Sequence, residues 1–218
     1  MDSERPAPPT QERRVHRPFY LVAAMVLVWI AGVEIFLDAA KIATVLRSGA
    51  LPDVETVVRA GGVDSYSLVG QVLMAARLTV MGSVPHLAFP LAVARAILAC
   101  TLIFASTTVL LGRPTARVFA LQSLGANAIF AIIEYALLKQ VRGTYIDMAA
   151  RGAALINDPT SSLSLPEFAH LIGYWLERVI FAARLGVPFA AALALTTQRT
   201  KVFFAEAAAA AESAEEEP

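Results

Sequence analysis

The chain has 218 residues, of which 57% are hydrophobic and 17% are charged, and its acidic and basic side chains are equal in number. An ordinary soluble domain is about 45–50% apolar and about 25% charged, so this composition indicates an integral membrane protein. Zero net charge gives no basis for a nucleic-acid partner. The single cysteine, Cys100, excludes an intrachain disulfide and a C-x-x-C metal motif.

The N-terminal region combines a basic tail with an apolar run. Residues 1–17 contain three prolines and four arginines with little apolar surface to bury, so we expect a mobile tail. The run that follows predicts a first spanning helix over residues 19–38. A cleaved signal peptide is the alternative, because Ala39 and Ala40 follow the run. A signal-peptide core has 7–15 residues, and this run is longer, which favours a retained anchor.

Residues 41–85 form the longest piece between predicted spans. Pro52 indicates a helix start and Gly61 a helix end, so a short helix fits between them. A second helix is expected from about Ser65 to Met81. Its strongly polar residues are Gln71 and Arg77, and we expect it to lie in the interface or against the other helices. A fifth span over residues 65–81 is the alternative.

The segment over residues 86–139 contains two long apolar runs joined by the basic turn GRPTAR, residues 112–117. Each run has about the 20 residues that a helix needs to cross ~30 Å of hydrocarbon. The turn is short, so the second run must return antiparallel to the first. The sequence therefore predicts a transmembrane hairpin with spans over residues 87–111 and 117–139.

The last third of the chain predicts one more span. A partly apolar helix over residues 141–157 precedes a loop, and Ser164 and Glu167 have the spacing of a capping box. We expect the fourth span over residues 168–197, with a kink at Pro188. The spanning domain then covers residues 18–204, and residues 205–218 form an acidic tail rich in alanine and glutamate.

These elements predict an all-α fold: a four-helix membrane bundle with up-down topology and short interfacial or extracytoplasmic helices. Four spans place both termini and the turn at residues 112–117 on one side, where basic residues are denser than in the opposite loops. The bias of lysine and arginine towards the cytoplasm then predicts that both termini are cytoplasmic. The composition suggests a bacterial inner membrane.

Ionisable residues inside the predicted spans are the candidate functional residues. Each costs ~2.5–3.5 kcal/mol on insertion scales, so each needs a partner or a role. Counting ~1.5 Å per residue along each helix places several of them at one depth, in the outer half of the bilayer. The predicted polar layer comprises Glu34, Asp38, Arg95, Glu134, His170, Glu177, Arg178 and Arg184.

Three interpretations of this layer stay open. The acids and bases can pair and fix the register of the helices, which is a structural role. They can instead form a proton- or ion-linked transport path. A metal site using His86, His170 and a carboxylate is a third reading, although no short ligand spacing supports it, and we predict no metal or cofactor. No catalytic motif accompanies the layer, so we predict no enzyme and no catalytic residue.

Small residues recur every four positions on the last predicted span, at Ala182, Gly186, Ala190 and Ala194. Such residues let membrane helices approach closely, so this helix-packing groove can hold a protein partner or a second copy of the chain. The first functional hypothesis is therefore a non-enzymatic structural or accessory protein whose partners are the lipid bilayer and another protein. The alternative is a small transporter or channel.

Overall fold

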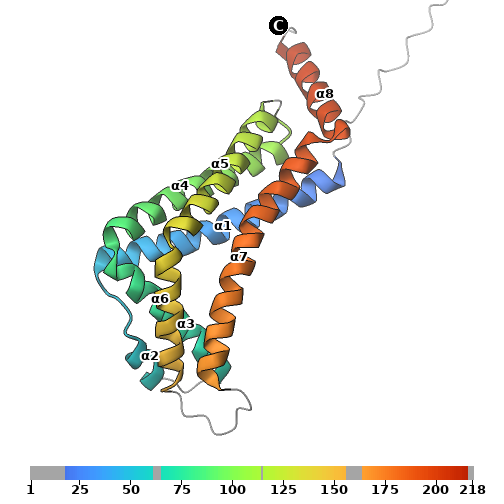
Figure 1. The fold of residues 1–218 in the computed structure, drawn as a ribbon. Helices are drawn as coiled ribbons and strands as arrows, with labels where there is room; N and C mark the ends of the chain where they lie inside the picture. Colours follow the sequence, from blue (N-terminus) through green and yellow to red (C-terminus); the bar gives the residue numbers. More distant parts are fainter. Residues whose placement is uncertain (1–17, 61–64, 114, 156–163, 216–218) are drawn as a thin grey trace, which may run out of the picture.

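The computed structural model describes residues 18–60, 65–113, 115–155 and 164–215, and these residues fold into helices joined by short connections (Figure 1). The predicted tail at residues 1–17, the loops at 61–64 and 156–163, and the last three residues lie outside the described residues. The helices are α1 (Phe19–Ser48), α2 (Val54–Ala60), α3 (Ser65–Ser83), α4 (Pro85–Leu110), α5 (Ala116–Leu137), α6 (Lys139–Ala153), α7 (Leu165–Thr196) and α8 (Gln198–Glu215).

Four of these helices, α1, α4, α5 and α7, are long and apolar enough to cross a membrane. They coincide with the four predicted spans. Among the described helices, α3 does not reach the same length and hydropathy, so the structure offers no support for a fifth span. Helix α1 runs ten residues past the predicted end at Asp38 and stops at Ser48, where Gly49 takes the left-handed conformation (φ 68°) that suits glycine.

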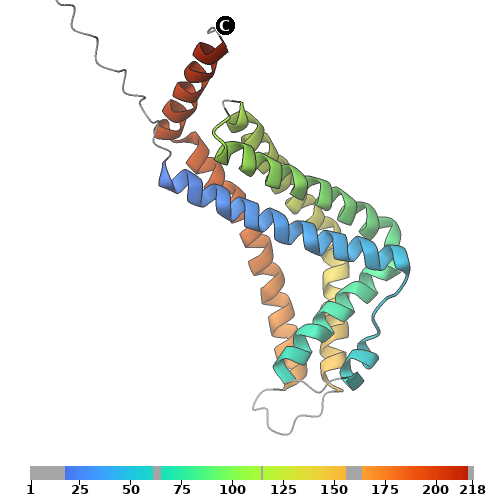
Figure 2. The ribbon, with the colours of Figure 1, turned by 180° about the vertical axis from the view of Figure 1, so that it is seen from behind.

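The long helices pack against one another in a closed series. Helix α1 contacts α4 and α7, and α5 contacts α4 and α7. Helices α1, α4 and α5 lie side by side, and α7 crosses them obliquely (Figures 1 and 2). At one end the Tyr20 hydroxyl lies 2.7 Å from the Thr197 hydroxyl, and Arg117 Nε donates to the Leu195 carbonyl at 3.0 Å. The start of α1, the α4–α5 turn and the end of α7 are therefore neighbours.

Helices α1 and α4 approach each other closely at Gly32 of α1. A Cβ atom at this position would lie 2.9 Å from Ile103 Cγ1 and 3.4 Å from the Ala99 carbonyl oxygen, both of α4. Ala99 is completely buried. Small residues on both helices thus permit the extensive α1–α4 contact.

At the opposite end, α3 and α6 pack against α7, and α2 packs against α3 and α6 (Figures 1 and 2). We call α2, α3 and α6 the cap. Helix α6 continues through both of its glycines, Gly143 and Gly152. A Cβ at Gly152 would lie 2.5 Å from Val54 Cγ1 of α2 and 3.0 Å from Val72 Cγ1 of α3. Gly152 therefore permits close packing of the three cap helices.

Two separate hydrophobic cores result from this arrangement. One joins the cap to the adjoining ends of the long helices and includes Ile42, Val72 and Ala149. The other fills the far end of the long helices and includes Met25 and Leu195. On α1, α4, α5 and α7 the charged residues of the predicted layer lie between the positions that supply these two cores.

Helix α7 begins after Ser164, close to the predicted start, but the predicted capping box does not form, because the Ser164 side chain makes no capping hydrogen bond. Pro188 lies within α7 and is buried. The helix ends at Thr196, and α8 continues in a different direction (Figure 1). Part of the predicted acidic tail, through Glu215, belongs to α8.

Candidate functional site

Five charged side chains, each from a different helix, meet between the two hydrophobic cores. We call them the charge network: Asp38 of α1, Arg77 of α3, Arg95 of α4, Glu134 of α5 and Arg184 of α7. Arg95 and Glu134 have side chains only 5% and 9% exposed. A charge can be buried to this extent only when it is paired, so the network ties these five helices together.

Asp38 is the shared acceptor of the network. Its Oδ2 atom lies 2.8 Å from Arg95 Nη2, 3.4 Å from Arg77 Nη2 and 4.0 Å from Arg184 Nη2. Arg77 also approaches Oδ1 through Nη1 at 3.5 Å, which makes its contact two-pronged. One carboxylate therefore faces three guanidinium groups from three helices.

Glu134 is the second acid of the network. Arg184 Nη1 donates to its Oε2 atom at 3.0 Å, and Arg95 Nη1 lies 3.6 Å from Oε1. Arg95 and Arg184 consequently bridge both acids, and the five side chains carry three positive and two negative charges when all are ionised.

Arg95 keeps one buried donor without a partner. Its Nε–H group finds no acceptor in the described part of the chain, although the whole residue is only 4% exposed. Three guanidinium groups offer five N–H donors each, whereas each carboxylate offers about four lone-pair sites. The charge network therefore has more donors than acceptors, and an unmade hydrogen bond of this kind is costly.

The charge network lies in the wall of a cavity of about 540 Å³. The cavity is bounded by residues of α1, α3, α4, α5, α6 and α7. Its apolar lining includes Val28, Leu73, Met74, Met81, Leu102, Phe130, Ala131, Leu138, Val141, Ile172, Leu176, Ile180, Val187 and Pro188. The site thus combines mostly apolar walls with a concentrated set of charges.

Two further predicted acids line the same cavity. Glu177 of α7 accepts a hydrogen bond from the Tyr145 hydroxyl of α6. Burial raises the pKa of Tyr145, and the neighbouring Glu177 carboxylate raises it further, so the phenol keeps its proton. Glu34 is exposed while lining the cavity, which places it at the rim.

Aromatic side chains form one part of the wall. Tyr135 of α5 and Phe181 of α7 stack with ring centroids 3.9 Å apart, and the Arg142 guanidinium lies 3.6 Å from the Tyr135 ring centroid. All three residues line the cavity. This stack joins α5 to α7 beside the charge network.

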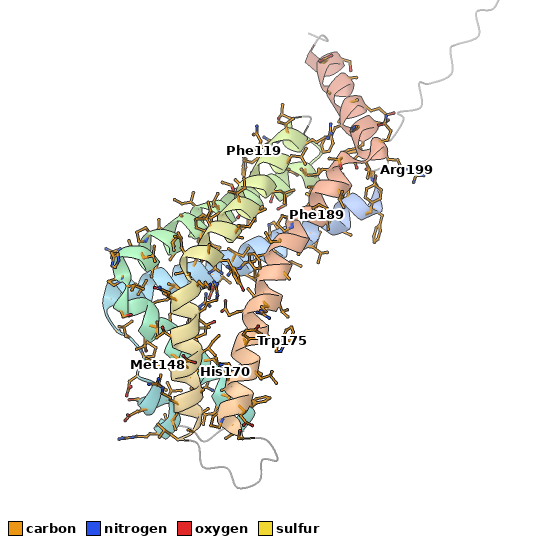
Figure 3. All side chains as sticks on the ribbon, in the orientation of Figure 1. Phe119, Met148, His170, Trp175, Phe189 and Arg199 are labelled. Carbon is orange, nitrogen blue, oxygen red and sulfur yellow. The ribbon has the colours of Figure 1, made fainter. Side chains whose placement is uncertain are left out.

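The structure places His170 and Arg178 away from the cavity. His170 lies two turns from Glu177 along α7, ~10 Å at 1.5 Å per residue, and its Nε2 is 3.9 Å from Asp147 Oδ1 of α6. Arg178 is one residue further round the helix than Glu177 and lies over the Tyr174 ring at 3.7 Å. Figure 3 shows His170 on the side of α7 towards α6 and Trp175 on the outer side.

Sequence reasoning placed Asp38, Arg95, Glu134 and Arg184 in one layer, and the structure brings these four together. It did not include Arg77, which belongs to a helix outside the predicted spans. The signal was present, because Arg77 is one of two strongly polar residues in an otherwise apolar helix. The described residues contain no cluster of three or more histidine, cysteine or acidic side chains arranged to hold a metal.

The predicted helix-packing groove on α7 faces outwards for most of its length. Ala182, Gly186 and Ala190 are exposed, and Ala194 is buried. A Cβ added at Gly186 would meet nothing within 4 Å. Contacts within the chain therefore leave this face open.

No protein family model matches the chain, and no curated protein or solved structure matches it either.

Proposed function

We propose that this protein binds a small molecule in the cavity between its cap and its four long helices. The cavity carries the proposal: its volume of about 540 Å³ falls within the ~300–1,000 Å³ typical of ligand pockets. Mostly apolar walls with a few convergent polar groups are also typical of such pockets. Ion pairing alone explains the charges, but it does not explain why they border an open volume.

We further propose how the protein sits in its membrane. Helices α1, α4, α5 and α7 cross the bilayer as an up-down bundle, with both termini in the cytoplasm and the cap on the outer side of a bacterial inner membrane. The shared end of α1, the α4–α5 turn and α7 supports this arrangement, because the basic residues Arg113, Arg117, Arg199 and Lys201 gather near it.

The class of function that fits this site is a carrier or transporter without catalytic activity. Ionisable side chains at membrane depth commonly mark the path of a substrate or ion. In the proposed orientation, the charge network lies near the outer boundary of the bilayer. Glu34 lies at the rim of the cavity, with its side chain exposed on the surface of α1. A ligand can then reach the cavity from the outer side.

Native mass spectrometry of the protein released in native lipid particles tests this function. Gly70 lines the cavity on α3, and a Cβ there would meet nothing within 4 Å, so Gly70→Phe adds a ring without a backbone clash. Gly143→Phe is the matched control, because Gly143 is equally open and lies on the exposed side of α6. We expect one small molecule for each chain in the wild type and in Gly143→Phe, and its loss in Gly70→Phe. The same bound molecules in all three proteins would contradict the proposal.

An accessory protein is the second candidate function. The open face formed by Ala182, Gly186 and Ala190 supports it, since small exposed residues on a membrane helix permit close approach of another helix. The same measurement separates the two candidates. A second protein subunit at fixed stoichiometry, with an empty cavity, would favour the accessory role.

A further inference from the structure

Building on the proposed function, we propose that the ligand is a single-chain amphiphile with an acidic head, either a carboxylate or a phosphate monoester. The head lies against the arginines of the charge network, and the chain lies along the apolar part of the cavity towards the cap. The inference rests on the binding function proposed above and adds the chemical class of the ligand.

The composition of the charge network selects the head. Arg77, Arg95 and Arg184 exceed Asp38 and Glu134 by one positive charge, and their N–H groups outnumber the acceptor sites of the two acids. An oxyanion supplies several acceptor atoms for these donors. Carboxylates and phosphates are the groups that guanidinium binds with strong, short hydrogen bonds.

Arg77 and Arg184 carry the accessible donors of the charge network. Arg95 is only 4% exposed and its unpartnered Nε atom is fully buried, so a ligand in the cavity does not reach this atom. The side chains of Arg77 and Arg184 are 17% and 20% exposed, and both residues line the cavity. A ligand oxyanion therefore meets the guanidinium groups of Arg77 and Arg184.

The remaining acids do not supply such an acceptor. Glu177 accepts a hydrogen bond from the Tyr145 hydroxyl, and its negative charge interacts favourably with Arg77 of the cap helix α3. Glu34 is exposed at the rim of the cavity. Arg142 also lines the cavity, but its guanidinium lies over the Tyr135 ring. The accessible donors thus remain those of Arg77 and Arg184, which line the cavity.

The shape of the cavity selects the chain. Its lining on α7 runs from Ile172 to Pro188, which is about 24 Å at 1.5 Å per residue. The cavity is therefore elongated along α7, and its walls are mostly apolar. An extended alkyl chain matches this length and these walls.

The cap end of the cavity accommodates the chain. Leu73 and Met74 of α3 and Ile172 of α7 line it with apolar surface. Gly70 also borders this end, and a Cβ there would meet nothing within 4 Å, so this position leaves open space. Apolar walls exclude a second polar group there, so the ligand has one polar end.

Binding of four matched probes to the full-length protein in detergent, measured by native mass spectrometry and by thermal unfolding, tests the inference. The probes share one alkyl chain length and differ in the head: palmitate, hexadecyl phosphate, hexadecanol and hexadecylamine. We expect at least one acidic probe to bind once per chain. Loss of one charge-assisted hydrogen bond lowers affinity about tenfold or more, so hexadecanol and hexadecylamine should bind at least that much more weakly.

Two variants locate the bound probe. Arg184→Lys keeps a positive charge but removes the planar set of guanidinium N–H donors, and we expect about tenfold weaker binding of the acidic probe. Because Arg184 also pairs with Glu134 and this variant can fail to fold, Gly70→Phe provides an independent variant that obstructs the cap end. Gly143→Phe should bind the acidic probe as the wild type does.

The results separate this inference from the proposed function. Preference for palmitate or for hexadecyl phosphate identifies the head as a carboxylate or a phosphate, and equal binding of both supports the shared oxyanion chemistry. If hexadecanol or hexadecylamine binds as tightly as the acidic probes and Gly70→Phe blocks it, the cavity binds ligands but the acidic head is wrong. If Gly70→Phe changes the binding of no probe, the cavity is not the binding site and the proposed function fails with it.

Discussion

Replacing Asp38 should weaken the contacts among several helices at once, because three arginines from three helices share its carboxylate. Asp38→Asn keeps the size of the side chain and leaves Glu134 as the acid that the three arginines share within the network. Breaking a buried ion pair from one side costs about 3–5 kcal/mol, and Asp38 is 24% exposed, so we expect a loss of about 3 kcal/mol. Unfolding in mixed micelles with increasing denaturing detergent measures this loss.

Glu55→Gln is the matched control for Asp38→Asn. Glu55 also pairs with an arginine, Arg59, at 3.3 Å, but the two side chains are 63% and 81% exposed. An exposed pair of this kind within a helix contributes ~0.5 kcal/mol or less. Equal destabilisation by the two changes would show that burial of the charge network does not matter for stability.

The four network residues that the sequence did predict share one property. Asp38, Arg95, Glu134 and Arg184 stand inside or beside long apolar runs, where a charge is so costly that a partner can be inferred from sequence alone. Which acid pairs with which arginine could not be predicted, because the pairing depends on how α3 packs against α1 in the folded protein. Arg77 completes the network only through that tertiary contact, so the sequence could not place it.

At the scale of helices, the close contact between α1 and α4 at Gly32 leads to a prediction about stability. We expect Gly32→Ala to destabilise the protein by about 1–3 kcal/mol, because its new methyl group would press on Ile103 and on the Ala99 carbonyl. A second change, Ile103→Ala, should restore part of the loss by removing the Cγ1 atom that the methyl group meets. Thermal unfolding of the single and double variants measures both effects.

Gly186→Ala controls for the general effect of replacing glycine in a long helix. A Cβ at Gly186 would meet nothing within 4 Å, and alanine is a better helix former than glycine by up to ~1 kcal/mol. This variant should therefore be as stable as the wild type or slightly more stable. Similar losses at Gly32 and Gly186 would refute the steric explanation.

The helices themselves were largely predictable, and their exceptions have physical reasons. Apolar length identified all four long helices, and Pro52 and Gly61 correctly bracketed the short helix α2. Helix α1 continues beyond Asp38, where the sequence predicted the end of the first span, and stops at Ser48 before the left-handed Gly49. Gly32 could not be identified as a contact point, since its partner Ile103 lies on another helix far along the chain.

At the scale of the whole molecule, the proposed orientation predicts which surfaces face each side of the membrane. Thr144 is exposed on the cap helix α6, and Thr115 is exposed in the α4–α5 turn. In a Cys100→Ser background, a membrane-impermeant maleimide should label Thr144→Cys in intact bacterial spheroplasts. It should label Thr115→Cys only after the membrane is permeabilised.

The labelling pattern has two outcomes that would count against the proposal. Labelling of Thr115→Cys alone in intact spheroplasts would invert the orientation. Labelling of both positions without permeabilisation would place the cap and the turn on the same side and exclude the four-span arrangement. Removal of Cys100 is needed because this cysteine is exposed on the surface of α4.

The 32 residues of α7 are more than one crossing of a bilayer requires. At 1.5 Å per residue the helix is about 48 Å long, against ~30 Å of hydrocarbon. One end is held among the cap helices and the other receives Arg117 and leads into α8, with Pro188 as an interior point where the helix lacks one backbone hydrogen bond. Helix α7 is therefore one continuous helix that contacts the cap, lines the cavity and leads into α8. Any change of its tilt at the cap would also displace its other end, next to α8.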